Sequence, residues 1–249
     1  MPTVGVEFAK VSYTLASGCV LLRDISLQLE AGTTTALLGR SGSGKTTLLR
    51  MVNGLVTPTS GEVRVAGRAT RDYDTVTLRR GIGYVIQETG LFPHMTVERN
   101  AGIALELAGR SKEGIASRVR EVLALVGLEY EEFRARYPWQ LSGGQRQRVG
   151  LARALATDPM VLLMDEPFGA LDPLTRAEMQ TMLRGLLERV GKTVLLVTHD
   201  LDEALYLAKR VVFLSEGAVA ADLLAGEVPG SDNPYVKDYV SAVHRAVPA

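Results

Sequence analysis

The sequence predicts an α/β fold in which helices cover both faces of a parallel sheet. Two observations support this class. First, apolar runs of strand length, 161–164, 194–198 and 211–214, alternate with stretches of helical spacing, 174–189 and 202–208. Second, a glycine-rich segment stands between a predicted strand and a predicted helix, which is where such sheets bind phosphate groups.

The N-terminal part predicts two half-buried strands of an antiparallel sheet, because apolar and polar residues alternate over 4–11 and 21–29. A short strand rich in β-branched residues follows at 33–38. The segment 46–54 then has the pattern of a helix that ends at Gly54.

Further along the chain, 81–86 predicts another strand and 96–156 predicts a block of helices. One helix of this block has apolar residues at helical spacing and a closing glycine: Ile115, Val119, Val122, Leu123, Val126 and Gly127. Residues 226–234, rich in Gly and Pro, predict a linker to a short terminal helix.

Length and charge narrow the class of protein. The 249 residues suit one large domain, or one domain with a sizeable insertion. The 28 Lys plus Arg residues balance the 28 Asp plus Glu residues, so the formal net charge is zero. A net charge of zero argues against binding to nucleic acid through bulk positive charge. The single Cys19 cannot form an internal disulfide, which is typical of a reducing cytoplasm, and we expect a partly buried thiol.

Signals for membrane insertion or export are not visible in the sequence. The apolar runs are far shorter than the roughly 20 residues of a membrane-spanning helix. Residues 1–7 lack the basic start and apolar stretch of a secretory signal. We therefore expect the protein to remain in the compartment where it is made.

Residues 39–46 fit the P-loop pattern, in which glycines let consecutive backbone N–H groups converge on the phosphates of a nucleotide. The following helix directs its N-terminus at the same anion. Lys45 is expected to reach the β- and γ-phosphates, and the Thr46 hydroxyl to ligate Mg²⁺. The predicted nucleotide-binding residues of the loop are Gly39, Arg40, Ser41, Gly42, Ser43, Gly44, Lys45, Thr46 and Thr47.

Two carboxylates, Asp165 and Glu166, directly follow the apolar strand at 161–164. In a parallel sheet this strand end lies beside the P-loop, so Asp165 is expected to hold Mg²⁺, directly or through water. Glu166 then points toward the γ-phosphate and is a candidate general base for an attacking water. The alternative is a solvated turn, and the P-loop upstream favours the roles in metal binding and catalysis.

Residues 141–145 resemble the signature sequence of the ATP-binding cassette (ABC) ATPases, and other motifs match that family in the same order. The signature residues are Leu141, Ser142, Gly143, Gly144 and Gln145. The other matches are Gln87 of the Q-loop, Ala170-Leu171-Asp172 of the D-loop, the switch histidine His199, and Tyr13, which the family stacks on adenine. For Tyr13 the alternative is packing on an edge strand.

The resemblance implies a P-loop NTPase with a RecA-like core, an N-terminal antiparallel β-subdomain and an inserted α-helical subdomain. It implies a single ABC ATPase domain over 1–249, with the core and β-subdomain at about 1–87 and 157–225, the helical subdomain at about 88–156, and a C-terminal extension at about 226–249.

The same resemblance implies how the site works. ATP and Mg²⁺ are the cofactors, with the metal held by Thr46, Gln87 and Asp165. Glu166 and His199 are the catalytic residues. Two chains, identical or closely related, pack head to tail, and each ATP is held by the P-loop of one chain and the signature of the other, with Asp172 of the D-loop between them.

Finer matches resemble the ATPases that import quaternary amines such as glycine betaine, choline and carnitine. The matching segments are 82–87, 90–97, 164–176 and 202–204. Importers of amino acids and of nitrate or sulfonates share much of this pattern and are an alternative. Because the chain stops at Ala249, we expect it to lack the C-terminal regulatory domain that part of this group carries.

The resemblance to importers also implies partners. They are multispanning permease subunits, a substrate-binding protein that acts through the permease, and no nucleic acid; the position is peripheral, at the cytoplasmic face of the inner or plasma membrane. The segment 88–98, with Leu91, Phe92 and Met95, is a candidate docking surface for the permease, although these apolar residues could instead form core.

Two other classes of protein are considered. A soluble ABC ATPase of DNA repair or of the ribosome usually carries a long coiled-coil insertion or two cassettes, and a P-loop kinase would not need the signature residues. Arg146, Arg148 and Arg153 follow the signature on one helix, and we interpret them as a solvated face rather than a groove for nucleic acid.

Overall fold

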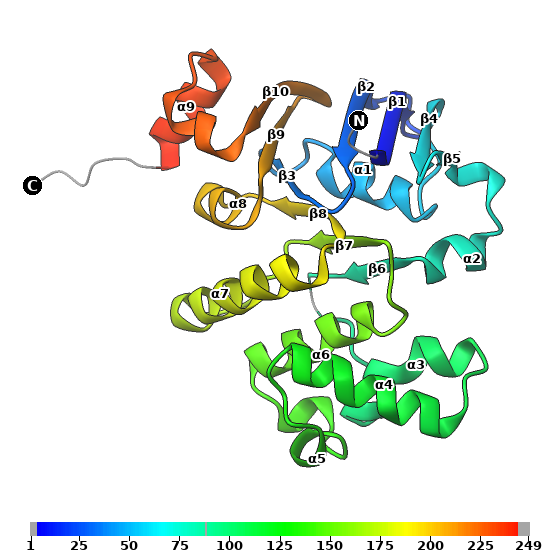
Figure 1. Ribbon diagram of the computed structural model, residues 1–249. Helices are drawn as coiled ribbons and strands as arrows, with labels where there is room; N and C mark the ends of the chain where they lie inside the picture. The colour runs from blue at the N-terminus through cyan, green and yellow to red at the C-terminus, as the bar shows by residue number, and fades with distance from the viewer. Residues whose placement is uncertain (1–3, 88, 244–249) are drawn as a thin grey trace, which may run out of the picture. The chain divides into compact units, whose positions relative to one another are not determined.

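A computed structural model of the protein describes residues 4–87 and 89–243, which divide into two compact units (Figure 1). The first unit takes the chain up to Tyr73 and again from Thr193, and the second takes Asp74–Lys192. Glu88 of the predicted docking segment, and residues 244–249 of the predicted extension, lie outside the described residues. Within the described ranges, no helix has both the length and the apolar character that crossing a membrane requires.

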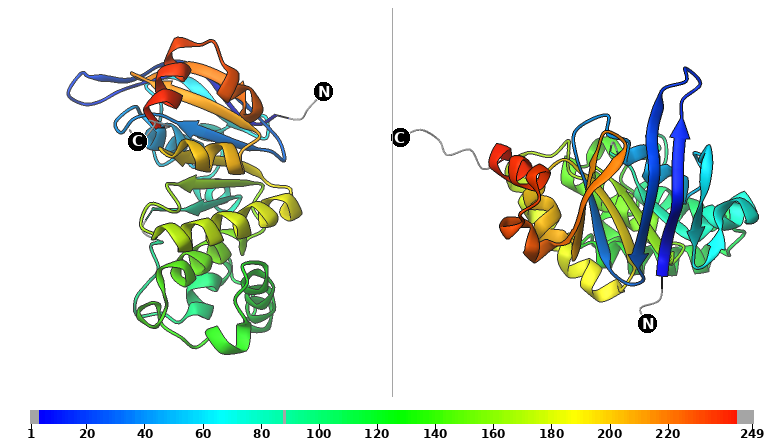
Figure 2. Two further views of the ribbon diagram at one scale, coloured as in Figure 1. Left: turned by 90° about the vertical axis from the view of Figure 1, so that its left-hand side faces the viewer. Right: turned by 90° about the horizontal axis from the view of Figure 1, so that it is seen from above.

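An antiparallel sheet in the first unit begins with the long hairpin drawn in blue in Figure 2. Its strand order is β2-β1-β4-β5, with β1 at Val4–Thr14, β2 at Val20–Glu30, β4 at Ser60–Val65 and β5 at Arg68–Ala69. Along β2, Ile25, Leu27 and Leu29 are buried while the residues between them are exposed. The predicted antiparallel sheet is confirmed.

Cys19 lies in the turn of this hairpin and is exposed. The expectation that the Cys19 thiol is partly buried was therefore wrong. The physical reason is that residues 15–20 are all exposed between the two strands, so nothing covers the side chain.

Four further strands of the first unit lie in the order β10-β9-β3-β8. They are β3 at Thr34–Leu38, β8 at Thr193–Thr198, β9 at Arg210–Ser215 and β10 at Ala218–Leu224. β3 pairs in parallel with both β8 and β9, which confirms the predicted parallel arrangement. The antiparallel edge strand β10 was missed, because its alanine-rich residues are only partly buried and carry little apolar signal.

The α-helices of the first unit are α1 at Lys45–Val52, α8 at Leu201–Leu207 and α9 at Pro234–Val243. Two 3₁₀ helices accompany them, η1 at Thr70–Asp72 beside the antiparallel sheet and η3 at Ala225–Gly230. The segment 226–234, predicted to be a linker, instead begins within the 3₁₀ helix η3. The reason is that Val228 of η3 is buried in the same apolar cluster as Val236 of α9 and Phe213 of β9.

The second unit has two parallel strands, β6 at Ile82–Val85 and β7 at Val161–Asp165. Its helices are α2 at Thr75–Arg80, α3 at Val97–Leu107, α4 at Lys112–Leu125, α5 at Tyr130–Phe133, α6 at Gly143–Leu155 and α7 at Pro173–Val190, with the 3₁₀ helix η2 at Pro138–Gln140. The predicted helical block is confirmed as α3 to α6. The helix expected to close at Gly127 is α4, and Gly127 has a φ of 70°.

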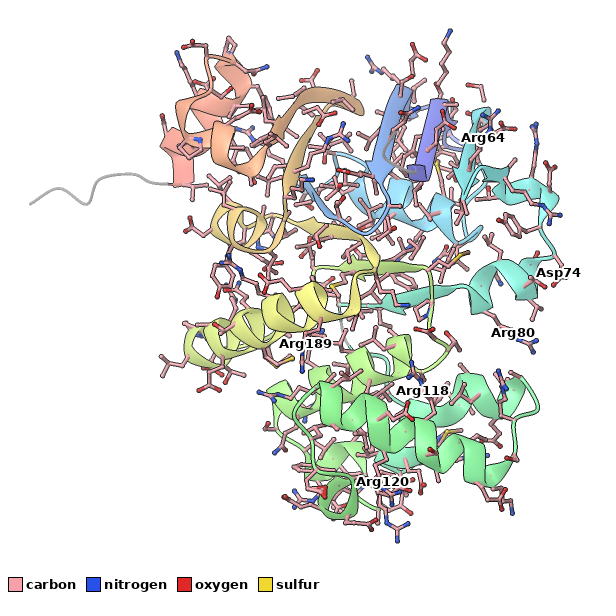
Figure 3. All side chains as sticks on the ribbon, viewed as in Figure 1. Arg64, Asp74, Arg80, Arg118, Arg120 and Arg189 are labelled. Atoms are coloured by element: carbon pink, nitrogen blue, oxygen red, sulfur yellow. The ribbon has the colours of Figure 1, made fainter. Side chains whose placement is uncertain are left out.

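Long side chains join the helices of the second unit by binding the carbonyl oxygens at helix ends. Arg118 of α4, labelled in Figure 3, donates to the carbonyl oxygens of Leu155 and Ala156 at the end of α6. Both distances are 3.0 Å. Arg189 of α7 donates to the carbonyl oxygen of Leu125 at the end of α4, at 3.3 Å. These carbonyl groups have no partner within their own helices, so each arginine satisfies them and fixes one helix against another.

A buried asparagine shapes the segment that precedes α3. The Asn100 side chain is 0% exposed; its amide donates to the carbonyl oxygens of Phe92, Met95 and Thr96, and its oxygen accepts from the Phe92 N–H at 2.7 Å. Asn100 thereby satisfies the backbone of a loop that has no regular structure of its own.

We expect Asn100→Ala to lower the free energy of unfolding by about 3 kcal/mol, because it strips partners from several backbone groups at once. Urea titration of the full chain measures the change. Arg99→Ala is the matched control, since Arg99 is exposed and its ion pair with Glu106 is worth less than about 1 kcal/mol. Equal destabilisation by the two substitutions would contradict the role of Asn100.

Candidate functional site

In the first unit, the register of three parallel strands brings predicted site residues to one edge. β3 lies between β8 and β9, with Leu38 paired to Thr198 on one side and to Phe213 on the other. Gly39 and His199, the next residues, therefore leave the sheet on neighbouring strands. This edge is the carboxyl end of the parallel strands, where open α/β sheets bind ligands.

The loop between β3 and α1 takes a course that only glycine allows at two points. A Cβ on Gly39 would lie 2.2 Å from the carbonyl oxygen of Leu214, far inside contact distance. Gly44, the N-cap of α1, has a φ of 97°, which costs a residue with a side chain about 1 kcal/mol or more. The backbone thus turns back on itself as the P-loop pattern predicts.

Lys45 folds over this loop. Its ammonium group donates to the carbonyl oxygens of Gly39, at 2.7 Å, and of Arg40, at 2.9 Å, and the residue is 5% exposed. α1 has neither a side-chain cap at its N-terminus nor an acidic residue in its first turn. The loop therefore presents a cation and the first N–H groups of a helix, a combination that suits an anion.

One hydroxyl of the loop is buried without a partner. Ser43 is 6% exposed, and its Oγ makes no hydrogen bond in the part of the chain that the structure describes. An unpaired buried hydroxyl costs roughly 1–3 kcal/mol, and a phosphate oxygen would remove that cost. The loop is in this respect incomplete without an acceptor.

His199 is exposed at the end of the fully buried strand β8. The turn that carries it is fixed by the next residue, since the Asp200 N–H donates to Thr198 Oγ1 at 3.0 Å. Asp200 Oδ1 in turn accepts from the Glu203 N–H, also at 3.0 Å, and caps α8. The imidazole is thus presented on a well-defined turn.

In the second unit, the pairing of β6 with β7 brings another set of predicted residues together. Val85 lies beside Met164 in parallel register, so Gln87 follows one strand close to where Asp165 ends the other. Asp165 is 7% exposed and accepts a hydrogen bond from Tyr84 Oη at 3.3 Å. A carboxylate and a carboxamide therefore occur at adjacent strand ends.

Glu166 has a φ of 46°, in the left-handed region that residues with a side chain rarely adopt. Its carbonyl oxygen accepts from the Gly169 N–H at 3.3 Å, which closes the turn. A Cβ on Gly169 would lie 3.7 Å from Gln87 Nε2 and 3.9 Å from Glu166 Oε2, so both polar groups lie near this glycine. Backbone strain of this kind concentrates at functional sites.

The predicted signature residues begin α6, as expected. Ser142 is the N-cap and forms a capping box with Gln145: Ser142 Oγ accepts from the Gln145 N–H at 3.2 Å, and the Gln145 side chain accepts from the Ser142 N–H at 2.9 Å. Gly143 and Gly144 lie between these two residues in the sequence, so their N–H groups are at the N-terminal, positive end of the helix dipole.

A pocket of about 210 Å³ within the second unit joins three of the predicted motifs. It is lined by Gln87, Thr89, Gly143, Arg146, Gln147, Pro167, Ala170 and Leu171. Gln147 is 4% exposed, and its Nε2 has no hydrogen-bond partner among the described residues. The structure thus brings the Q-loop, the signature and the D-loop to one place.

Asp172 of the predicted D-loop is the N-cap of α7. Its Oδ1 accepts from the Thr175 N–H at 3.1 Å. Hydrogen bonds from the Thr175 side chain and backbone hold the pKa of the Asp172 carboxyl below its ordinary value, so the group stays ionised. Asp172 therefore fixes the start of α7, a role that sequence reasoning did not assign to it.

The three arginines of α6 do not form a solvated face, and that interpretation was wrong. All three are half-buried and donate to carbonyl oxygens of loops: Arg146 to Leu141 at 2.7 Å, Arg148 to Val126 at 2.9 Å, and Arg153 to Thr89 and Gly90 at 2.7 and 2.6 Å. Burial lowers the pKa of Arg153. Arg146 and Arg153 thus support the signature and the segment after Gln87.

The predicted site residues fall into two groups. The first unit carries Tyr13, Gly39 to Thr47 and His199, and the second carries Gln87, Leu141 to Gln145, Asp165, Glu166 and Asp172. Tyr13 is half-buried near the end of β1, opposite Leu22 of β2.

Comparison with known proteins places these motifs in a family. The family model described as ABC transporter matches residues 22–169. The "Glycine betaine uptake system ATP-binding protein YehX" of Escherichia coli (strain K12) is 49% identical over 86% of this chain and 69% of its own length. The "Sulfate/thiosulfate import ATP-binding protein CysA" of Nocardia farcinica is 50% identical over 80% of this chain and 59% of its own.

Other curated relatives at 41–47% identity are named as carnitine, choline and osmoprotectant transport ATP-binding proteins. The chain spans about half to two thirds of the length of these relatives. Among solved structures, the bacterial ABC transporter cassette MJ0796 superposes with a TM-score of 0.79 at 36% identity, over 88% of this chain and 98% of that one. It was solved as a dimer and in a post-hydrolysis state bound to ADP and Pi.

The left-handed backbone at Glu166 yields a stability test. We expect Glu166→Gly to be more stable to unfolding than Glu166→Ala by about 1 kcal/mol, because alanine retains the strain that glycine removes. Thermal or urea unfolding measures the difference. The control pair is Glu178→Gly and Glu178→Ala on the exposed side of α7, where glycine should be less stable by about 1 kcal/mol. The same order at both positions would exclude strain at Glu166.

Proposed function

The chain belongs to the ABC transporter family, and we propose that it is the ATP-hydrolysing subunit of an importer for a small polar solute. The observation that carries the proposal is the family match over 22–169, which includes both the P-loop and the acidic residues Asp165 and Glu166 at the end of β7. The geometry supports it, because these residues stand at the carboxyl ends of parallel strands.

The P-loop is the proposed site for the phosphates of ATP. Lys45, the N–H groups of α1 and the unpaired hydroxyl of Ser43 are the donors that a phosphate group requires. Magnesium at such sites takes oxygen ligands from one or two side chains, and from phosphates and water. Thr46, Gln87 and Asp165 each carry an oxygen of this kind, so their donors fit Mg²⁺, which would neutralise negative charge on the phosphates.

Hydrolysis is proposed to depend on Glu166 and His199. Glu166 takes a proton from the attacking water while the water oxygen forms a bond to the γ-phosphorus; the bond to the β-γ bridging oxygen breaks, and ADP and phosphate leave. His199 contacts the γ-phosphate and positions the water. Its exposed place at the end of β8, next to the strand that leads into the P-loop, supports this role.

A head-to-tail dimer, of two copies or of close relatives, is proposed to complete each ATP site. The N–H groups of Gly143 and Gly144 at the start of α6, which the capping box of Ser142 and Gln145 does not use, suit the γ-phosphate of an ATP bound to the partner chain. Asp172 is proposed to act in the D-loop, and Tyr13 to stack on adenine, as the family resemblance implies. The similar cassette MJ0796 was solved as a dimer, which supports a dimer here.

The permease subunits are proposed to bind segment 88–98 from the membrane side. Phe92 is 41% exposed, which argues against its assignment to the core, and Asn100 holds the backbone around it. A preformed loop with an exposed aromatic residue is suited to a protein contact. The chain would then lie at the cytoplasmic face of the membrane, and a substrate-binding protein would act on it through the permease.

The proposed solute is a quaternary amine. This is supported by the names of the relatives that transport glycine betaine, carnitine and choline. The sulfate/thiosulfate relative favours an oxyanion as the second candidate. No site residue of this chain discriminates between the two, because the solute is bound by other subunits.

We expect Glu166→Gln to lower the rate of ATP hydrolysis at least about 100-fold, because the amide cannot accept the proton of the attacking water. Binding of ATP should persist, since the P-loop and Asp165 are unchanged. Phosphate release and titration with a fluorescent ATP analogue measure the two properties. Glu178→Gln, an exposed acid on α7, is the control, and near-normal turnover of Glu166→Gln would exclude the assigned base.

The solute can be tested in liposomes that hold the chain together with its permease subunits and binding protein. Glycine betaine should stimulate ATP hydrolysis and its own uptake, because a loaded binding protein acts on the ATPase through the permease. The complex that carries Glu166→Gln controls for uptake without hydrolysis. Stimulation by sulfate, and not by glycine betaine, would replace the first candidate with the second.

A further inference from the structure

The C-terminal helix α9 makes a direct contact with the turn that carries His199. Tyr239 Oη donates a hydrogen bond to the carbonyl oxygen of His199 at 2.9 Å. On its other side the same turn is fixed by the bonds among Thr198, Asp200 and Glu203. The side chain of Tyr239 therefore binds the backbone of a turn that lies 40 positions earlier in the sequence.

The Tyr239 ring is anchored in the core of the first unit. It packs edge-to-face on Phe213, with ring centres 5.6 Å apart, and Phe213 is 0% exposed. Phe213 in turn pairs with Leu38, the last residue of β3. The Tyr239 ring is therefore anchored on β9, which pairs with the strand that leads into Gly39.

The Tyr239 phenol remains a hydrogen-bond donor throughout the physiological range. Burial, with smaller contributions from Tyr235 and the charge of Asp200, raises the pKa of Tyr239 to about 12. A neutral phenol keeps the proton that it donates to the His199 carbonyl oxygen.

α9 also faces the P-loop. A pocket of about 590 Å³ lies between them, with Arg40, Ser41 and Gly42 on one side and Tyr235 and Tyr239 on the other. Figure 1 shows α9 near β10, the edge strand of this sheet. One side chain of α9 thus both lines the space beside the P-loop and binds the histidine turn.

We propose that Tyr239 is a positioning residue for ATP hydrolysis: its bond to the His199 carbonyl oxygen holds the histidine turn in the geometry that the reaction requires. The inference rests on the proposed function, since it gives His199 a role in turnover. Misplacement of a catalytic group by about 1 Å can lower a rate by two orders of magnitude, so a single bond to its backbone is enough to affect turnover.

Tyr239→Phe tests the inference, because it removes the hydroxyl and keeps the ring on Phe213. We expect kcat for ATP hydrolysis by the full chain to fall about five-fold, the effect of one net hydrogen bond, with the KM for ATP unchanged. Tyr235→Phe is the matched control from the same helix and ring cluster, and should leave kcat unchanged. Among the described residues, the Tyr235 hydroxyl makes no hydrogen bond. Equal kcat values for wild type and Tyr239→Phe would overturn the inference.

The same substitution in a His199→Ala chain distinguishes a positioning role of Tyr239 from a general effect on protein stability. If Tyr239 acts through His199, then Tyr239→Phe should cause no further loss of single-turnover hydrolysis in a His199→Ala chain. A five-fold loss in that background, or an effect on KM alone, would overturn the inference, as would a fall in kcat matched by loss of folded protein in urea titration. A wild-type chain without ATP hydrolysis would overturn the proposed function as well, which distinguishes the two failures.

Discussion

The parallel pairing of β3 with β8 and β9 is the constraint on which the chemistry of the first unit depends. Because the register sets Leu38 of β3 beside Thr198 of β8, the chain leaves the sheet at two neighbouring points. One exit becomes the P-loop and one the histidine turn. The strands themselves are buried and apolar, so the position of these exits is held by the core and not by the polar residues that use them.

The second unit uses a different device to hold its loops. Its functional segments have little regular structure, and their backbone groups must still be hydrogen-bonded where they are buried. Asn100 and the three arginines of α6 supply those bonds from long or branched polar side chains. Arg146 in this way holds the backbone at Leu141, just before α6, and Arg153 holds the segment after Gln87. A polar side chain on a helix is therefore not by itself a sign of a solvated face.

Several elements could be predicted because their signals are local. The alternation in β2, the glycine after α4 and the capping box of Ser142 and Gln145 each depend on residues within one or two turns of one another. The P-loop is of the same kind, since the spacing of its glycines alone predicts a turn that suits an anion. The exposed Cys19, the edge strand β10 and the helical half of the expected linker were missed, because each depends on what does or does not cover a short segment.

What the sequence by itself determined was the fold class, the family motifs and the identity of the candidate nucleotide-binding and catalytic residues. The tertiary structure alone decided the left-handed backbone at Glu166, the unpaired hydroxyl of Ser43 and the bond from Tyr239 to the turn of His199. The physical reason is the separation along the chain of the residues that determine each feature. Periodicity, turns and caps are set by neighbours in the chain, whereas strain, burial and contacts across 40 residues are set only when separate elements pack together.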